Sequence, residues 1–199
     1  MSSNSKKRLS CFISFRHFPY DFDFADLIRN KLGTNDIDVD VTWSGNLPSG
    51  QHRDQCRAAI FESDFAIVIL SPSGFKKSDG TPGMSAQELE VTWIGSRYGK
   101  HVQGEDHFPV IIVNLQQQGA DGGWRHTFKS YPGLKGAHEW IEGQSSVVSE
   151  ARPGSPWLDD LIRYVRQIKT EFITRKIVED QHEIEALSAE TEAGSSVQE

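Results

Sequence analysis

An unbroken apolar run, FAIVIL at Phe65–Leu70, constrains the fold of this chain more than any other feature of its sequence. A strand with one face in water would alternate apolar and polar residues, so this run is typical of a parallel strand covered on both faces. A similar run, FPVIIVNL, occupies Phe108–Leu115. Further strands are predicted at Ser10–Phe15, Asp38–Trp43 and residues 136–141 (GAHEWI), which gives five strands.

Segments with helical periodicity separate these strands. They are Asp23–Leu32, Arg53–Ser63, Ser85–Gly99 and Ser155–Phe172. The alternation predicts an α/β fold, a five-stranded parallel sheet with helices on both faces. Ligands of such folds bind beyond the carboxyl ends of the strands, which directs attention to the loops after Phe15, Trp43 and Leu70.

Chain length and charge favour one domain with an acidic extension. The chain has 199 residues, enough for a single core. From Glu171 to Glu199 there are eight acidic and two basic residues, a net charge of −6, whereas the whole chain carries −7. We therefore predict a disordered terminus at residues 1–9, a folded domain at residues 10–172, and an acidic tail at residues 173–199. The tail is predicted to be helical at its start and disordered beyond it.

Charge and composition disfavour several classes of partner. The nearly neutral domain has no basic stripe of the kind that binds nucleic acid. No apolar run approaches the ~20 residues that cross a bilayer. The only two cysteines, Cys11 and Cys56, are typical of a reducing compartment. We therefore expect a cytoplasmic protein with neither a membrane nor a nucleic-acid partner.

Common nucleotide-binding and hydrolase motifs are missing. The sequence contains no G-x-x-x-x-G-K-[ST], no G-x-G-x-x-G after the first strand and no G-x-S-x-G. This argues against a P-loop, a dinucleotide-binding Rossmann domain and a nucleophile elbow. The histidines and cysteines lack ligand spacing, so no metal site is expected.

Several segments occur in an informative order and spacing. They are CFISFRH and D..FADLI...L near the N-terminus, then DVDVTWSGNLPSGQ and QCRAAIFESDFAIVILSPSGF. In this order they resemble the first signature box, second strand, long loop and third strand of Toll/interleukin-1 receptor (TIR) domains. The resemblance spans roughly residues 10–172 and is strongest up to Leu115. It implies a flavodoxin-like fold, in agreement with the alternation of strands and helices.

The resemblance implies one of two functions. Many TIR domains are non-enzymatic scaffolds or effectors that act through TIR–TIR contacts. Others cleave NAD⁺ at the nicotinamide–ribose bond and release nicotinamide with a linear or cyclic ADP-ribose product. The small single-domain build is similar to that of bacterial TIR proteins in antiphage systems such as Thoeris. We therefore favour an NAD⁺ glycohydrolase or cyclase that self-associates through its TIR domain, takes NAD as substrate, needs no cofactor and signals to a downstream effector.

The resemblance places the essential carboxylate early in the third helix. TIR enzymes commonly carry a W-x-x-x-E pattern there, and matching GMSAQEL to it puts Glu88 at the catalytic position, with Met84 in place of the tryptophan. If the family pattern is aligned on the following YGK instead, its glutamate position falls closer to Glu90, so Glu90 is the alternative. The two glutamates point to nearly opposite sides of a helix. Ser85 and Glu88 also form a capping-box pattern, in which Glu88 would only bond the helix start.

The resemblance also implies substrate contacts. Phe15 would stack on nicotinamide or adenine, and Arg16 would pair with the diphosphate. Trp43 would form a second aromatic wall, and Ser71 would line the pocket. Each residue also has a purely structural interpretation, as core, surface or turn. One carboxylate is sufficient for the reaction, because nicotinamide leaves without a proton and the carboxylate stabilises an oxocarbenium-like ribose.

Overall fold

The computed structural model describes residues 8–16, 19–34, 36–43, 52–70, 86–115, 134, 147–148 and 151–195. Strands and helices alternate along these residues, as the sequence predicts for an α/β fold. The chain divides into two compact units, Met1–Asp160 and Leu161–Glu199. The first unit contains the sheet, and the second contains most of the last helix.

The sheet is parallel and has four strands of ordinary length. They are β1 (Leu9–Ser14), β2 (Val39–Trp43), β3 (Phe65–Leu70) and β4 (Val110–Leu115), in the order β2-β1-β3-β4. The prediction of a five-stranded sheet is met by only four full strands in the described residues, because the fifth position holds only the two-residue β5 (Val147–Val148), which pairs with the end of β4. The strand predicted at residues 136–141 lies outside the described residues. The order is that of doubly wound folds such as flavodoxin.

The start of β2 differs from the prediction by one residue. The strand begins at Val39, because Asp38 has a φ of 52° and its N–H donates to the carbonyl oxygen of Thr34 at 2.8 Å. This left-handed conformation belongs to a turn, and Asp tolerates it better than most residues do. The turn sets the register in which Leu9 of β1 pairs with Val39 of β2.

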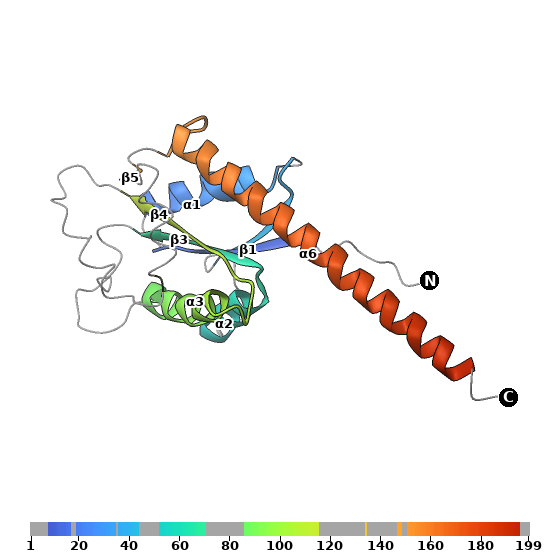
Figure 1. Ribbon diagram of the computed structural model, residues 1–199. Helices are drawn as coiled ribbons and strands as arrows, with labels where there is room; N and C mark the ends of the chain where they lie inside the picture. Colours follow the sequence, from blue (N-terminus) through green and yellow to red (C-terminus); the bar gives the residue numbers. More distant parts are fainter. Residues whose placement is uncertain are drawn as a thin grey trace. The chain divides into compact units, whose positions relative to one another are not determined.

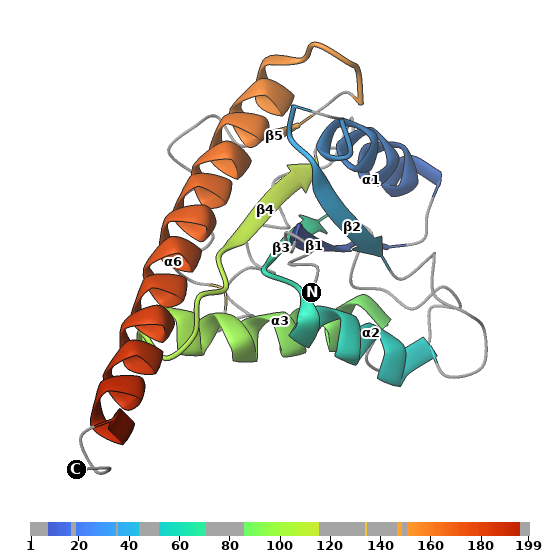
Figure 2. The same cartoon turned by 90° about the vertical axis from the view of Figure 1, so that its right-hand side faces the viewer.

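Helices cover both faces of the sheet, as predicted. The helices of the first unit are α1 (Pro19–Leu32), α2 (His52–Glu62) and α3 (Ala86–Val102). Helix α1 lies on one face, and α2 and α3 lie together on the other (Figures 1 and 2). Helix α1 begins four residues before the predicted Asp23, at a proline whose fixed φ suits the first helical position.

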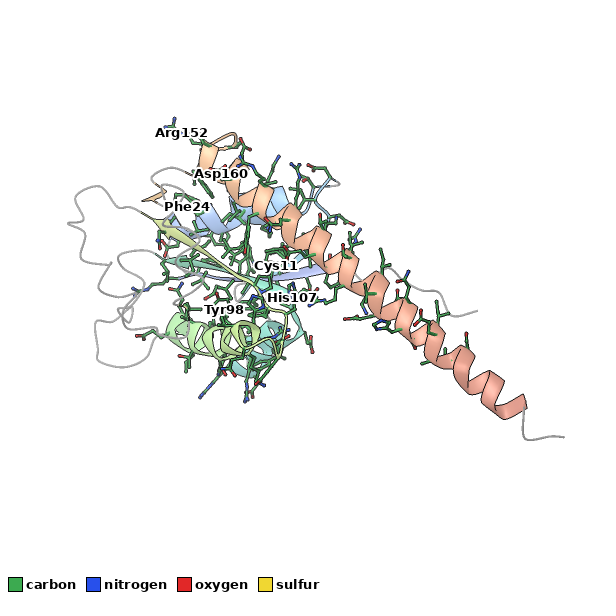
Figure 3. All side chains as sticks on the ribbon, in the orientation of Figure 1. Cys11, Phe24, Tyr98, His107, Arg152 and Asp160 are labelled. Atoms are coloured by element: carbon green, nitrogen blue, oxygen red, sulfur yellow. The ribbon has the colours of Figure 1, made fainter. Side chains whose placement is uncertain are left out.

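The core follows the central strands. All six residues of β3 are buried, and so are Phe12 and Ile13 of β1. The burial of β3 confirms the inference drawn from its unbroken apolar sequence. Both cysteines are buried thiols that form no disulfide, and Cys11 is fully buried in the first unit (Figure 3).

The last helix, α6 (Pro156–Ser195), is longer than the sequence predicts. Its first turn belongs to the first unit, where the Trp157 ring packs on Phe24 with a centroid distance of 5.8 Å. The helix continues without a break past residue 172, and its later part contains the strong helix formers Ala and Glu. An exposed ion pair between Lys176 and Glu179, at 3.1 Å, supports this part. None of the described helices combines the length and apolar character needed to cross a membrane.

Candidate functional site

A buried carboxylate lies at the carboxyl end of β1. Glu90 of α3 is only 2% exposed, and its Oε2 accepts a hydrogen bond from the Ser14 hydroxyl at 2.7 Å. Ser14 is the last residue of β1 and is itself fully buried. Carboxylates are almost never buried without partners, and the Ser14 hydroxyl is such a partner for Glu90. The contact also joins the first turns of α3 to the sheet edge where doubly wound folds bind ligands.

A thiol contacts the second oxygen of the same carboxylate. The Sγ of Cys56, on α2, lies 3.8 Å from Glu90 Oε1. Burial first, and then the charge and hydrogen bonding of Glu90, raise the pKa of Cys56 to about 12. The thiol therefore stays protonated at neutral pH and acts as a weak donor to the carboxylate. Ser14 is thus a strong hydroxyl donor to Oε2 of Glu90, and Cys56 is a weak thiol donor to Oε1.

The inner face of α3 explains why Glu90 points inward. Gln87, Glu90, Val91 and Ile94 are all buried and recur at the three- and four-residue intervals of one helix face. Gln87 Nε2 donates to the carbonyl oxygen of Ile69 at 2.7 Å, which fixes the helix start to β3 as well. The sequence already carried this signal, because Val91 and Ile94 mark the apolar side of the helix and Glu90 lies on it.

Glu88 lies on a different side of α3. It is partly exposed, and its carbonyl oxygen accepts a hydrogen bond from the Thr92 hydroxyl at 2.7 Å. Helix α3 begins at Ala86, so Glu88 falls in the first turn, where a carboxylate interacts favourably with the helix dipole. Ser85, the other half of the predicted capping box, lies outside the described residues. The structure therefore brings Glu90, and not Glu88, against the end of β1.

An aromatic cluster adjoins this edge of the sheet. The ring centroid of Phe15 lies 5.4 Å from that of Trp43 and 6.2 Å from that of Phe22, and Phe22 and Trp43 are 5.4 Å apart. Phe15 and Trp43 are buried, whereas Phe22 is exposed. The guanidinium of Arg29 lies 4.5 Å from the Trp43 ring centroid, within cation–π range. The structure thus brings together the two aromatic residues predicted from the sequence.

Phe22 and Arg29 are additions that the sequence reasoning missed. They are seven residues apart on α1, which places them two turns apart on one face of the helix. The sequence could have indicated this shared helix face through the seven-residue spacing. Nothing in the sequence indicated that both side chains contact the ring of Trp43.

Arg16 follows Phe15 directly and is half-buried. Burial lowers the pKa of its guanidinium, and the nearby carboxylate of Asp21 partly offsets that effect. A guanidinium remains charged at neutral pH after such a shift, so this edge of the sheet carries a cation. Ser71, the remaining predicted site residue, lies outside the described residues, as does the loop at 44–51.

The described residues do not indicate a metal site. No group of three or more His, Cys, Asp or Glu side chains in that part of the chain is arranged to hold an ion. The rings of Tyr98 and His101 are tilted at a centroid distance of 5.5 Å, and His101 and His107 meet edge to face at 5.4 Å. They lie where α3 ends and before β4 begins (Figure 3 labels Tyr98 and His107). Among the described residues, the candidate site contains one carboxylate with hydroxyl and thiol donors, an arginine and three aromatic rings.

Comparison with known proteins gives limited likenesses. No protein-family model matches the sequence, and no curated protein matches it significantly. Among solved structures, a conserved protein from Enterococcus faecalis V583 is similar at a TM-score of 0.44 and 12% identity, over 81% of this chain and 99% of that one. The TIR domains of the activated Roq1 resistosome, which recognizes the pathogen effector XopQ, are similar at a TM-score of 0.37 and 15% identity, over 82% of both chains. At these values neither likeness assigns a family or an activity.

Proposed function

We propose that this chain is a TIR-like NAD⁺ glycohydrolase or cyclase and that Glu90 is its essential carboxylate. The observation that carries the proposal is the hydrogen bond of Glu90 to Ser14, which holds a buried carboxylate at the end of the strands where doubly wound folds commonly bind ligands. Of the two glutamates that the sequence leaves open, Glu90 has this position and Glu88 does not. Glu90 therefore replaces Glu88 as the preferred residue.

The unequal partners of the carboxylate fit this chemistry. Ser14 holds Oε2 at 2.7 Å, whereas the Cys56 thiol is a weak donor 3.8 Å from Oε1. A ribose hydroxyl of the substrate would take the place of the thiol at Oε1, because a hydroxyl is the stronger donor. Glu90 would then stay oriented by Ser14 while it contacts the sugar.

The reaction needs no further catalytic group. The bond between the ribose carbon and the nicotinamide nitrogen breaks, and nicotinamide leaves as a neutral molecule with the bonding electron pair. The carboxylate of Glu90 stabilises the positive charge that develops on the ribose. Attack by water, which then loses a proton, gives linear ADP-ribose, and attack by the adenine of the same molecule gives a cyclic product.

The neighbouring residues supply binding contacts for such a substrate. The exposed ring of Phe22 offers a stacking surface, and the buried rings of Phe15 and Trp43 pack against it. Stacking of a substrate on Phe15 or Trp43 themselves would require these rings to be uncovered, whereas Arg16 offers a charge partner for the diphosphate. Ser71 remains a proposed pocket residue. The product would act as a signal to a downstream effector, with antiphage defence as the proposed setting.

The competing proposal is a non-enzymatic TIR scaffold, in which Glu90 only clamps α3 to β1 and α2. Release of nicotinamide from NAD⁺, measured at high protein concentration, separates the two. We expect Glu90→Gln, which keeps an acceptor for Ser14, to reduce the rate by about 100-fold or more. Glu88→Gln is the matched control and should leave the rate little changed. A thermal melt would verify that both variants are folded, and mass spectrometry would distinguish linear from cyclic product.

Two results would overturn this assignment. If concentrated wild-type protein releases no nicotinamide, the enzymatic proposal fails and the scaffold replaces it. If Glu88→Gln abolishes release while Glu90→Gln does not, the enzyme stands but its carboxylate is Glu88.

A further inference from the structure

The C-terminal half of α6, from Ile173 onward, exposes a row of large apolar side chains. Ile173, Ile177, Ile184 and Leu187 are between 47% and 64% exposed, and all lie in the second unit. With Asp180 they form a series spaced by four, three, four and three residues. This is the heptad spacing of a coiled-coil seam, and we call these five residues the α6 seam.

The α6 seam lies on a helix that is already formed. Helix α6 is continuous over 40 residues, and the seam occupies roughly 22 Å of it at 1.5 Å per residue. Association along the seam would therefore not have to nucleate a helix, which is the step that makes short isolated helices unstable. Aligned exposed apolar side chains of this kind mark association surfaces more often than scattered ones do.

We propose that the α6 seam pairs with the α6 seam of a second copy of this chain, in antiparallel orientation. The charges beside the seam decide the orientation. In a parallel pair, Asp180 would face Asp180 of the other copy, and Lys176 would face the neutral Gln181. Like charges face each other in that arrangement, and no opposite charges meet.

An antiparallel pair removes this conflict. With Ile173 opposite Ile184 of the other copy, Lys176 falls opposite Glu183, and the two-fold symmetry forms this ion pair twice. Lys176 also contacts Glu179 of its own helix at 3.1 Å, but an ammonium has three donors and can bond both carboxylates. Asp180 then lies opposite an isoleucine, where one polar residue fixes the register and lowers the stability of the pair.

The proposal predicts a reversible, concentration-dependent dimer, because the seam is only about two heptads long. Sedimentation equilibrium of the full chain measures it. We expect wild type to dimerise and Ile184→Asp to stay monomeric at the same concentration. Val178→Asp is the matched control, because Val178 is 44% exposed on the same helix but lies off the seam. It should dimerise like wild type, and circular dichroism should show equal helix content in all three proteins.

A charge reversal tests the partner and the orientation. Lys176→Glu and Glu183→Lys should each weaken the dimer, and the double variant should restore it, because the ion pairs re-form with reversed signs. The proposal is overturned by a wild type that stays monomeric at every attainable concentration. It is also overturned by an Ile184→Asp variant that dimerises like wild type, by a Val178→Asp variant that disrupts equally, or by a double variant that does not recover. These results do not depend on NAD⁺ cleavage.

Discussion

The inner face of α3 and the C-terminal half of α6 depart from ordinary burial in opposite directions. On α3, Glu90 and Gln87 are buried beside apolar neighbours. On α6, Ile177 and Ile184 are exposed to solvent. A buried polar group and an aligned exposed apolar row are both informative departures, because most polar groups are exposed and most large apolar groups are buried.

The comparison teaches that helical periodicity identifies a face but not what the face contacts. Both rows repeat at three- and four-residue intervals. The buried row of α3 has its partners in the structure, Ser14 and Cys56 for Glu90 and the carbonyl oxygen of Ile69 for Gln87. The row of α6 is exposed to solvent, and the dimer proposed above would cover it. The same kind of substitution should therefore have large effects on α3 and small effects on α6 when folding stability is measured.

The largest difference in folding stability between the two regions is expected when one arginine is replaced in each. Arg97 of α3 is 13% exposed, and its Nε donates to Asp106 at 2.7 Å. Its Nη1 donates to the carbonyl oxygens of Ile60, at 2.9 Å, and Ser63. Arg97→Ala would leave these acceptors without their donor, so we expect it to lower the free energy of unfolding by about 3 kcal/mol.

Arg175→Ala on α6 is the control. Arg175 is 36% exposed and lies 4.0 Å from Glu179, so its loss should change stability by less than about 0.5 kcal/mol. Urea denaturation of both variants gives the two values. Equal losses would show that the two regions do not differ in the way that their burial implies.

Replacing one serine in each region should give a smaller difference in folding stability. The Ser14 hydroxyl donates to the buried Glu90, whereas the Ser188 hydroxyl donates to the carbonyl oxygen of Ile184 on the exposed C-terminal half of α6. We expect Ser14→Ala to lower the free energy of unfolding by about 1.5 kcal/mol, because a buried carboxyl oxygen loses its donor. Ser188→Ala should change it by less than about 0.5 kcal/mol. A Ser14→Ala variant as stable as wild type would remove the evidence that this hydrogen bond anchors α3.

The sequence predicted those parts of the fold that depend on short-range patterns. The FAIVIL run identified β3, and the alternation of strands and helices identified the α/β architecture. The predicted ends of strands and helices differ from the observed ones where the conformation of a single residue decides them. Asp38 is an example, because its φ of 52° places it in the turn before β2. Strand β5 has only two residues, which is too few for any periodicity to show.

The candidate site was less predictable, because its contacts join distant parts of the chain. Ser14 and Cys56 are 76 and 34 residues away from Glu90 in sequence, and only the packed structure brings them together. Phe15 and Trp43 were predicted as site residues, and the structure does place their rings side by side. The choice between Glu88 and Glu90 stayed open because Met84 stands where the expected tryptophan would have fixed the alignment.

The smallest expected effect is the dependence of folding stability on acidic pH through Asp106. Burial alone would raise the pKa of Asp106, but the hydrogen bond and charge of Arg97 outweigh it, and the His107 N–H and His101 add to them, so the pKa lies below its ordinary value. A carboxyl whose pKa is lowered on folding stabilises the fold above the unfolded pKa of about 3.9. That contribution disappears as the pH falls through the folded value.

Asp106→Asn should therefore be less stable than wild type at pH 7, by about 1 kcal/mol or less, because Asp106 is 29% exposed and partly screened by solvent. The difference should shrink as the pH falls below about 4. Glu179→Gln is the control on α6, where the exposed pair with Lys176 should contribute little to stability. Urea denaturation across this pH range measures both. A difference between Asp106→Asn and wild type that persists unchanged in acid would mean that the lost stability comes from packing and not from the charge on Asp106.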